Sequence, residues 1–219
     1  MVQGTLLGFL GLLLAFGLTM AVGRYESRRT LIVQEANDIG TTYLRAQLLP
    51  EPFRSESLDL LRSYTSTAVD LADQVSDSAR FDADLASMDQ LQRELWAVAG
   101  RAVADDAVGT GPRLYVESIN PMFDTHTERV ASLRNHVPTT VSLLQVLGSA
   151  VALGVLALYL AMLGRGLTTA LAAAAVVILI VLISFDLDRP QRGFITVPFA
   201  PLTDLRASMD LPPPTDGGG

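Results

Sequence analysis

The sequence predicts an all-helical integral membrane protein with three membrane-spanning helices and a long helical polar domain. The 219 residues are 49% hydrophobic and only 18% charged, and their mean hydropathy of +0.35 is too high for an ordinary soluble domain. Three uncharged blocks contain most of the apolar residues, whereas the segment between the first two blocks is rich in Arg and Asp. A single soluble core would not separate its composition in this way.

The three apolar blocks have the length of membrane spans. Residues 2–23 contain no ionisable side chain, and at about 1.5 Å per residue they cross a hydrocarbon core of about 30 Å. The alternative is a secretory signal peptide, but the basic residues Arg24, Arg28 and Arg29 follow the block instead of preceding it. Residues 2–23 are therefore interpreted as a signal anchor that starts outside. Residues 141–163 and 167–185 are the second and third spans, joined in a tight helical hairpin.

The distribution of arginines predicts the orientation of these spans. All 16 cationic residues are Arg, and only Arg165 lies near the span ends on one side. The other side would contain Arg24, Arg28, Arg29, Arg129, Arg134, Arg189 and Arg192. The positive-inside rule then places residues 24–140 and the C-terminal segment in the cytoplasm, at the inner (plasma) membrane of the cell.

Small residues form a stripe along the first span. They recur at steps of four and three, which places them on one helix face, and they are Gly4, Gly8, Gly11, Ala15 and Thr19. Such a face lets another helix approach closely, so we expect helix packing there, within one chain or between chains. The alternative is that glycine is simply common in membrane helices. Weaker versions occur in the other spans, at Ala150 and Gly154 and at Ala170 and Ala174.

Residues 24–140 are expected to form a cytoplasmic helical domain. The first span continues as a helix until Pro50 and Pro52 end it. Two amphipathic helices follow, with apolar positions at Leu58, Leu61, Thr65, Ala68, Ala72 and Val75, and at Leu85, Met88, Gln92, Leu95, Ala99 and Ala102. A last helix begins near Pro112 and runs to about Asn135, and we expect Pro121 to kink or break it.

The C-terminal segment is expected to contain no helix. Residues 186–205 have too many prolines and are predicted to lie on the membrane face or against a neighbour. Residues 206–219, which end in LPPPTDGGG, are predicted to be a disordered tail.

Several classes of function are disfavoured by composition. The chain has no cysteine, which excludes disulfides and Cys-ligated metals, and its net charge of −7 argues against nucleic acid as a partner. A metal site at His126 would need carboxylates such as Asp124 and Glu128, but their spacing places them on other helix faces. We therefore expect His126 to be a surface histidine. The second histidine is His136. No catalytic motif, metal site or cofactor site is recognisable, so we expect no enzyme.

Three clusters of polar residues are candidate sites. The first follows the last span and contains Asp186, Asp188 and Arg189. The second lies on the first long helix and contains Glu35, Asn37, Asp38 and Arg45. The third lies near Pro121 and contains Asn120, Asp124, Glu128 and Arg129, within reach of the others if the helices form a bundle. Such clusters more often set the register of helices than bind an ion or ligand.

Four strings resemble a known family. In chain order they are RYESRRTLIVQEANDIGTTYLRAQLLP, LWAVAG, SINPMFDTHTERV and FDLDRPQRGFITV, within a match from about Gly4 to Leu205. They are similar to the bestrophin-like domain of unknown function in bacterial membrane proteins. The resemblance implies a helical membrane fold and distant kinship with bestrophins, which are pentameric anion channels. Family members usually have a fourth span before the position of Gly4. We therefore expect either that this sequence has a truncated start or that it represents a shorter subtype of the family.

The resemblance implies a homo-oligomer, a pentamer by kinship, that conducts chloride or another anion. The pore would be lined by the first span of each copy, and no residue of this chain is assigned to a selectivity filter. The alternative is a non-conducting scaffold whose cytoplasmic helices bind a partner while the spans anchor it in the bilayer. A membrane enzyme ranks third, because no catalytic set reaches the membrane.

Overall fold

The computed structural model describes residues 2–73, 78–135, 137–162, 164, 167–188 and 194–211. These residues form seven α-helices, and none of them is in a strand. The chain divides into two compact units. Unit 1 comprises Met1–Ser27 and Arg134–Thr196, and unit 2 comprises Arg28–Leu133 and Val197–Gly219.

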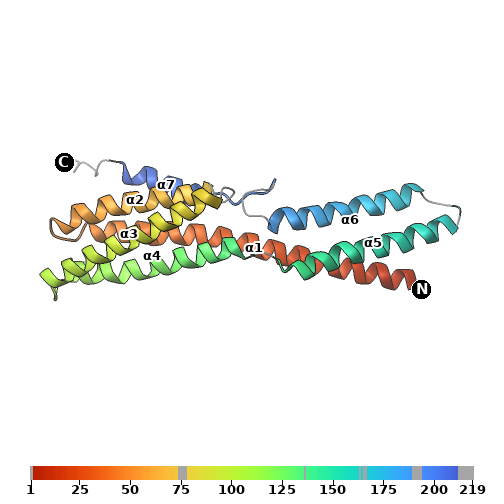
Figure 1. Cartoon of the computed structure of the whole chain (residues 1–219), viewed down its shortest axis with the longest axis horizontal. Helices are drawn as coiled ribbons and strands as arrows, with labels where there is room; N and C mark the ends of the chain where they lie inside the picture. Colours follow the sequence, from red (N-terminus) through yellow and green to blue (C-terminus); the bar gives the residue numbers. More distant parts are fainter. Residues whose placement is uncertain are drawn as a thin grey trace, which may run out of the picture. The chain divides into compact units, whose positions relative to one another are not determined.

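Unit 1 contains the apolar helices. They are the first part of α1 (Val2–Ala46), α5 (Thr139–Met162) and α6 (Leu167–Asp188), and α5 and α6 lie side by side (Figure 1). Three helical stretches are long and apolar enough to cross a membrane, which confirms the expected fold class: Leu7–Ala46, Thr110–Met162 and Thr168–Asp188. Gly164 has a φ of 62° at the end of α5, a left-handed conformation that glycine adopts without strain.

The core of unit 1 is small. Leu10 and Leu14 of α1 and Ala152 of α5 are buried, and three partly buried side chains of α6 pack against them, namely Val177, Ile180 and Val181. Gly17 lets the helices approach, because a Cβ at this position would lie 1.7 Å from Nε2 of Gln145 on α5. The side of α1 that packs within the chain is therefore the one that contains Leu10, Leu14 and Gly17.

Unit 2 contains the polar helices. It includes the second part of α1, α2 (Phe53–Asp73), α3 (Ser78–Asp105), α4 (Thr110–Arg134) and α7 (Ala200–Met209) (Figure 1). The expected apolar positions of α2 and α3 are buried or partly buried, and Val75 lies outside the described residues. Large apolar side chains from five helices are fully buried in this core: Ile39, Leu61, Leu71, Met88, Leu95, Ile119, Met122 and Leu202.

Two expectations about prolines have different outcomes. Helix α1 continues beyond the first span to Ala46, just before Pro50 and Pro52, as expected. Of the kink or break expected at Pro121, the break does not occur, because α4 is helical without interruption from Thr110 to Arg134. Pro121 lies on the exposed side of α4. Water can therefore satisfy the backbone carbonyl that loses its partner there.

The C-terminal segment contains a helix that the sequence interpretation missed. Helix α7 spans Ala200–Met209, so the expected absence of helix in residues 186–205 and the expected disorder from residue 206 are wrong over this range. Pro201 lies in the first turn, where a missing N–H breaks no helical hydrogen bond. Leu202 and Met209 are buried, and α7 packs against α2. Residues 212–219 lie outside the described part of the chain.

Candidate functional site

A buried group of charges joins α1 to α4 in unit 2. Glu35 of α1 is completely buried and Arg129 of α4 is 2% exposed. Nε of Arg129 pairs with Oε2 of Glu35, and Nδ1 of His126 lies 2.9 Å from Oε1 of the same carboxylate. We call these three side chains the Glu35 cluster. Both oxygens of the carboxylate have a cationic or polar partner, which compensates for the loss of water around a buried charge.

Helix α2 covers the Glu35 cluster. The Arg129 guanidinium donates a hydrogen bond to the backbone carbonyl of Ala68, at 3.4 Å. The ring of Tyr64 lies edge-on to the ring of His126, with centroids 6.0 Å apart. Burial of the Tyr64 phenol, and then the negative charge of Glu35, raise the pKa of Tyr64 far above its ordinary value of 10. Tyr64 therefore remains a neutral hydrogen-bonding group at physiological pH.

A second layer of polar contacts lies next to this cluster. The Thr125 hydroxyl of α4 donates to Oδ2 of Asp38 on α1, at 2.7 Å, and accepts from Nε2 of Gln34, at 3.3 Å. Further along, the Thr42 hydroxyl donates to the carbonyl of Ser118, at 3.1 Å, and Arg45 donates to the carbonyl of Leu114, at 2.9 Å. This series of contacts sets the register of α1 against α4.

The second and third expected polar clusters meet only in part. Glu35 and Arg129 form the ion pair described above, and Arg45 contacts the backbone of α4. Asn37, Asn120 and Asp124 are exposed and lie outside this contact. The reason is helical geometry, because residues one or two positions apart on a helix point in different directions.

The expectation that His126 is a surface residue is wrong. Its side chain is 6% exposed and faces the carboxylate of Glu35. One signal in the sequence pointed to this position, because His126 follows Ile119 and Met122 at helical spacing on the buried side of α4. Asp124 and Glu128 are exposed, so they do lie on other faces, as expected. His136 lies outside the described residues.

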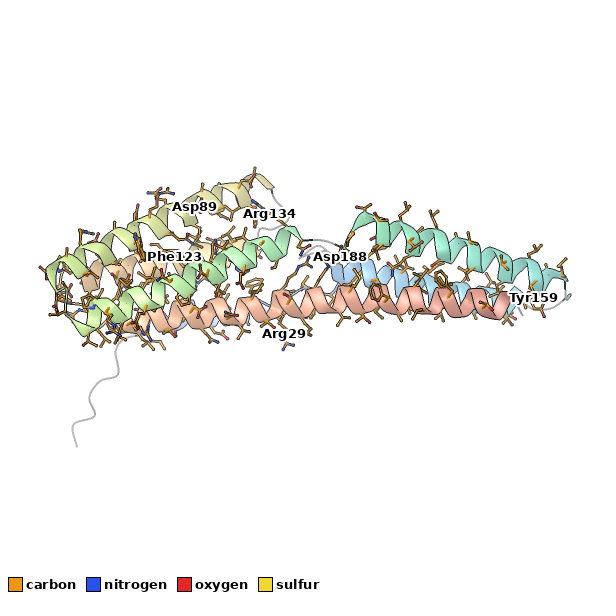
Figure 2. The ribbon with its side chains drawn as sticks, turned by 90° about the horizontal axis from the view of Figure 1, so that it is seen from below. Arg29, Asp89, Phe123, Arg134, Tyr159 and Asp188 are labelled. Atoms are coloured by element: carbon orange, nitrogen blue, oxygen red, sulfur yellow. The ribbon has the colours of Figure 1, made fainter. Side chains whose placement is uncertain are left out.

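The first expected cluster lies at the end of α6 in unit 1, where Figure 2 labels Asp188. The Asp188 carboxylate accepts a hydrogen bond from the backbone N–H of Val137, at 2.9 Å. The Asp186 carboxylate accepts from the backbone N–H groups of Phe194 and Ile195, at 2.9 and 2.8 Å. The two carboxylates hold the chain segments that flank α5 and α6. Arg189 lies outside the described residues.

The small-residue face of α1 is exposed within the single chain. A Cβ at Gly4, Gly8 or Gly11 would have nothing within 4 Å. Ala15 and Thr19 are also exposed, and the Thr19 hydroxyl donates to the carbonyl of Ala15, at 2.8 Å. No helix of the same chain packs on this face in the described residues, so its use as a packing face remains a prediction about contacts between chains.

Two buried polar residues of α5 were not singled out from the sequence. Gln145 is 3% exposed and Ser149 is 7% exposed, and they lie one turn apart on the side of α5 that faces α1. Nε2 of Gln145 and Oγ of Ser149 have no hydrogen-bond partner within the described chain. The signal available in the sequence was the polar spacing of four residues within an otherwise apolar span.

The described residues contain no group of three His, Cys, Asp or Glu side chains that could hold a metal ion. The Glu35 cluster is closed to solvent and acts as a set of contacts between helices.

Among the curated proteins and the solved structures compared, none matches this chain. The sequence model of the Bestrophin-like domain family matches residues 5–202. This match covers most of the 219 residues, and the chain therefore belongs to the bestrophin-like domain family.

Proposed function

We propose that this protein forms a homo-oligomer in the cell membrane and conducts small anions such as chloride. The observation that supports this proposal best is the open face of α1. Gly4, Gly8 and Gly11 lie on one side of a membrane-length helix, and a Cβ at any of them would meet no atom of the chain within 4 Å. Faces of this kind are typical of close contacts between membrane helices. In a homo-oligomer, a helix of a second copy of the chain would pack on this face.

The low burial of the spans is consistent with such an assembly. In each of the three membrane-length stretches, little of the most apolar window is buried within the chain: 22% in the first, 17% in the second and 11% in the third. The helices of one copy contact each other on one side, so their other sides face lipid or further copies. An axial path lined by one α1 from each copy would then be formed between chains.

Kinship gives the proposed ion and subunit number. Bestrophins, to which this family is distantly related, are pentameric anion channels, so we propose a pentamer and an anion. The apolar and Thr side chains of α1 would form a constriction that gates by dewetting. We also propose that the protein is not an enzyme.

The arginines support an orientation with unit 2 in the cytoplasm. Arg24, Arg29 and Arg134 follow or precede apolar helices on the side of the polar domain. By the positive-inside rule this side is cytoplasmic, in a bacterial inner membrane. A protease added to sealed, right-side-out vesicles is expected to leave the α2 to α4 segment intact, and cleavage there would contradict the orientation.

The channel proposal is tested by chloride flux in liposomes. Purified protein is expected to give flux above that of empty vesicles and to form an oligomer in native mass spectrometry. Gly8→Leu fills the open face and is expected to abolish both, whereas Phe16→Leu, on an exposed lipid-facing side of α1, is expected to retain both. A monomer, or an oligomer with no flux, would contradict conduction.

A non-conducting interaction protein is the second candidate. It is favoured by an open groove of about 490 Å³ between α3 and α4 of unit 2. An oligomer that binds a peptide in this groove but shows no chloride flux would support the second candidate over the first.

A further inference from the structure

The groove on unit 2 has the composition of a peptide-binding site. Four of its lining residues come from α3 and two from α4, and Figure 2 labels one of each, Asp89 and Phe123. Its volume is about 490 Å³, and it is lined by Asp89, Gln92, Arg93, Trp96, Asn120 and Phe123. Two aromatic rings, two amides and one charge of each sign thus lie along one open surface.

Several of these groups are available to a ligand. Trp96 is 49% exposed although it is the one tryptophan of the chain and the largest apolar side chain on α3. Asp89, Arg93 and Asn120 are exposed and make no ion pair or side-chain hydrogen bond within the described residues. Asn120 can therefore donate to a carbonyl, and Arg93 can pair with a carboxylate.

The base of the groove is held in place by the core. Nε2 of Gln92 donates to the hydroxyl of Tyr64, at 3.4 Å, and the rings of Phe123 and Tyr64 stack with centroids 6.5 Å apart. Tyr64 is completely buried and lies against His126. A groove whose floor is fixed in this way loses little conformational entropy when a ligand binds.

We propose that this groove binds a proline-rich segment, and that residues 211–216 of a second copy of the chain provide it. The sequence of these residues is LPPPTD. Consecutive prolines favour the polyproline II helix, whose rings dock between aromatic side chains and whose carbonyls accept hydrogen bonds from groove donors. Trp96 and Phe123 supply the aromatic walls, Asn120 supplies the donor, and Arg93 pairs with Asp216.

The segment is assigned to a second copy. Helix α7 is held on the α1 and α2 side of unit 2, where the Tyr43 hydroxyl donates to the carbonyl of Met209 and the Thr65 hydroxyl contacts its sulfur. The residues that line the groove belong to α3 and α4. Pro214 is only five residues beyond Met209, and five residues span at most about 18 Å. So short a tether on the α2 side favours the groove of a neighbouring copy over that of the same copy.

This inference goes beyond anion conduction and does not depend on it. The proposed contact links the polar units of two copies, whereas the glycine face of α1 links their spans. Loss of peptide binding and loss of chloride flux can therefore be observed separately.

Cysteine cross-linking tests the contact in the full-length chain. Because the protein has no native cysteine, two single-Cys variants can be mixed without background. Asp124→Cys lies one turn from Asn120 at the groove, and Thr215→Cys lies in the segment. Mild oxidation of the mixture in detergent is expected to give a disulfide-linked dimer of the two variants. Ser87→Cys, exposed on the opposite side of α3, is the matched control and is expected to give none.

The fluorescence of Trp96 gives a second test. The recipient is the full chain in which Pro212, Pro213 and Pro214 are replaced by alanine, so that its own segment no longer competes. A synthetic peptide of residues 208–219 is expected to shift the Trp96 emission in a saturable manner. The same peptide with three alanines in place of the prolines is expected to produce no shift, and Phe123→Ala in the recipient is expected to abolish it.

The proposal is overturned by either of two results. Equal cross-linking at Ser87→Cys and Asp124→Cys would mean that the segment has no preferred site. A peptide titration that leaves the Trp96 emission unchanged, in a recipient with wild-type helix content, would mean that the groove does not take this segment.

Discussion

In unit 2 the buried carboxylate of Glu35 has a partner on each of its oxygens, whereas in unit 1 the buried amide nitrogen of Gln145 has none within the described chain. The difference extends to the whole of each unit. Unit 2 buries a continuous core from α1, α2, α3 and α4, while the apolar helices of unit 1 leave large side chains such as Phe9, Leu12 and Phe16 exposed.

This contrast shows which part of the fold one chain can complete. Unit 2 pairs its buried Glu35 carboxylate with groups of the same chain and packs a continuous apolar core around it, so its structure is determined by contacts within the chain. Unit 1 leaves apolar surface uncovered, and only lipid or further copies can cover it. Substitutions in the two units are therefore expected to differ in what they change: stability in unit 2, and assembly in unit 1.

The largest effect is expected from Glu35→Gln. The substitution leaves the guanidinium of Arg129 buried without a counter-charge, a loss that typically costs about 3–5 kcal/mol. Chemical unfolding followed by the fluorescence of Trp96, which lies in unit 2, should show this decrease. Asn37→Ala, exposed on the same helix, is the control and should change stability by less than about 0.5 kcal/mol. Equal effects of the two substitutions would mean that the Glu35 cluster does not support unit 2.

Alkaline pH is expected to destabilise unit 2 next most strongly. Burial is the main cause that raises the pKa of Tyr115 from 10 to about 12. Since the folded state has the higher pKa, the stabilisation is complete below pH 10 and is lost as the pH rises to about 12, by roughly 2–3 kcal/mol. Unfolding midpoints measured across this range should fall, and should fall less in Tyr115→Phe. A variant that matches the wild type at every pH would contradict this role of Tyr115.

Gly111→Ala is expected to be destabilising by about 1–3 kcal/mol, as for other overpacked sites. An added Cβ would lie 2.6 Å from the backbone carbonyl oxygen of Leu48, so the end of α1 and the start of α4 would have to move apart. Gly100→Ala is the matched control, because nothing lies within 4 Å of its added Cβ. That variant should be more stable than wild type by up to about 1 kcal/mol. The same sign for both variants would rule out the close approach at Leu48.

The smallest effect is expected from Gln145→Leu in unit 1. It replaces an amide that has no partner for its nitrogen by an apolar group of similar size, so thermal stability in micelles should stay equal or rise, by less than about 1 kcal/mol. Gln92→Leu in unit 2 should have the opposite sign, because it removes the partner of the buried Tyr64 hydroxyl. Clear destabilisation by Gln145→Leu would contradict the absence of a partner for this amide.

Much of the fold could be predicted from the sequence because its signals are local. The apolar blocks are long, the helical spacing in α2 and α3 is regular, and α1 ends near Pro50 and Pro52. Helix α7 was missed because its apolar positions, Leu202, Leu205 and Met209, are few and prolines precede them. Its stability comes from packing against α2, and such a tertiary contact leaves little trace in ten residues.

The candidate site was predictable only in its composition. The charged residues of α1 and α4 were identified, but their pairing depends on the rotation of two helices far apart in sequence. A rotation by one residue, about 100°, would exchange Glu35 for Ala36 at the contact. The burial of His126 also required tertiary information, because a histidine has similar propensities for surface and core. The groove between α3 and α4 was not predicted, because the helical spacing of its lining residues defines one face of each helix but not which two faces lie together.

The pairing of Glu35 with His126 and Arg129 constrains the order in which the protein folds during synthesis. His126 is 91 positions after Glu35, so about two fifths of the 219 residues are made after Glu35 before its carboxylate acquires either partner. During that interval the charge must stay in water, and the half of α1 that contains Glu35 cannot dock. Helices α2 and α3 are neighbours in sequence and can pair first. The arrival of α4 then supplies both partners of Glu35, and α7, which is made later still, packs on α2 after that.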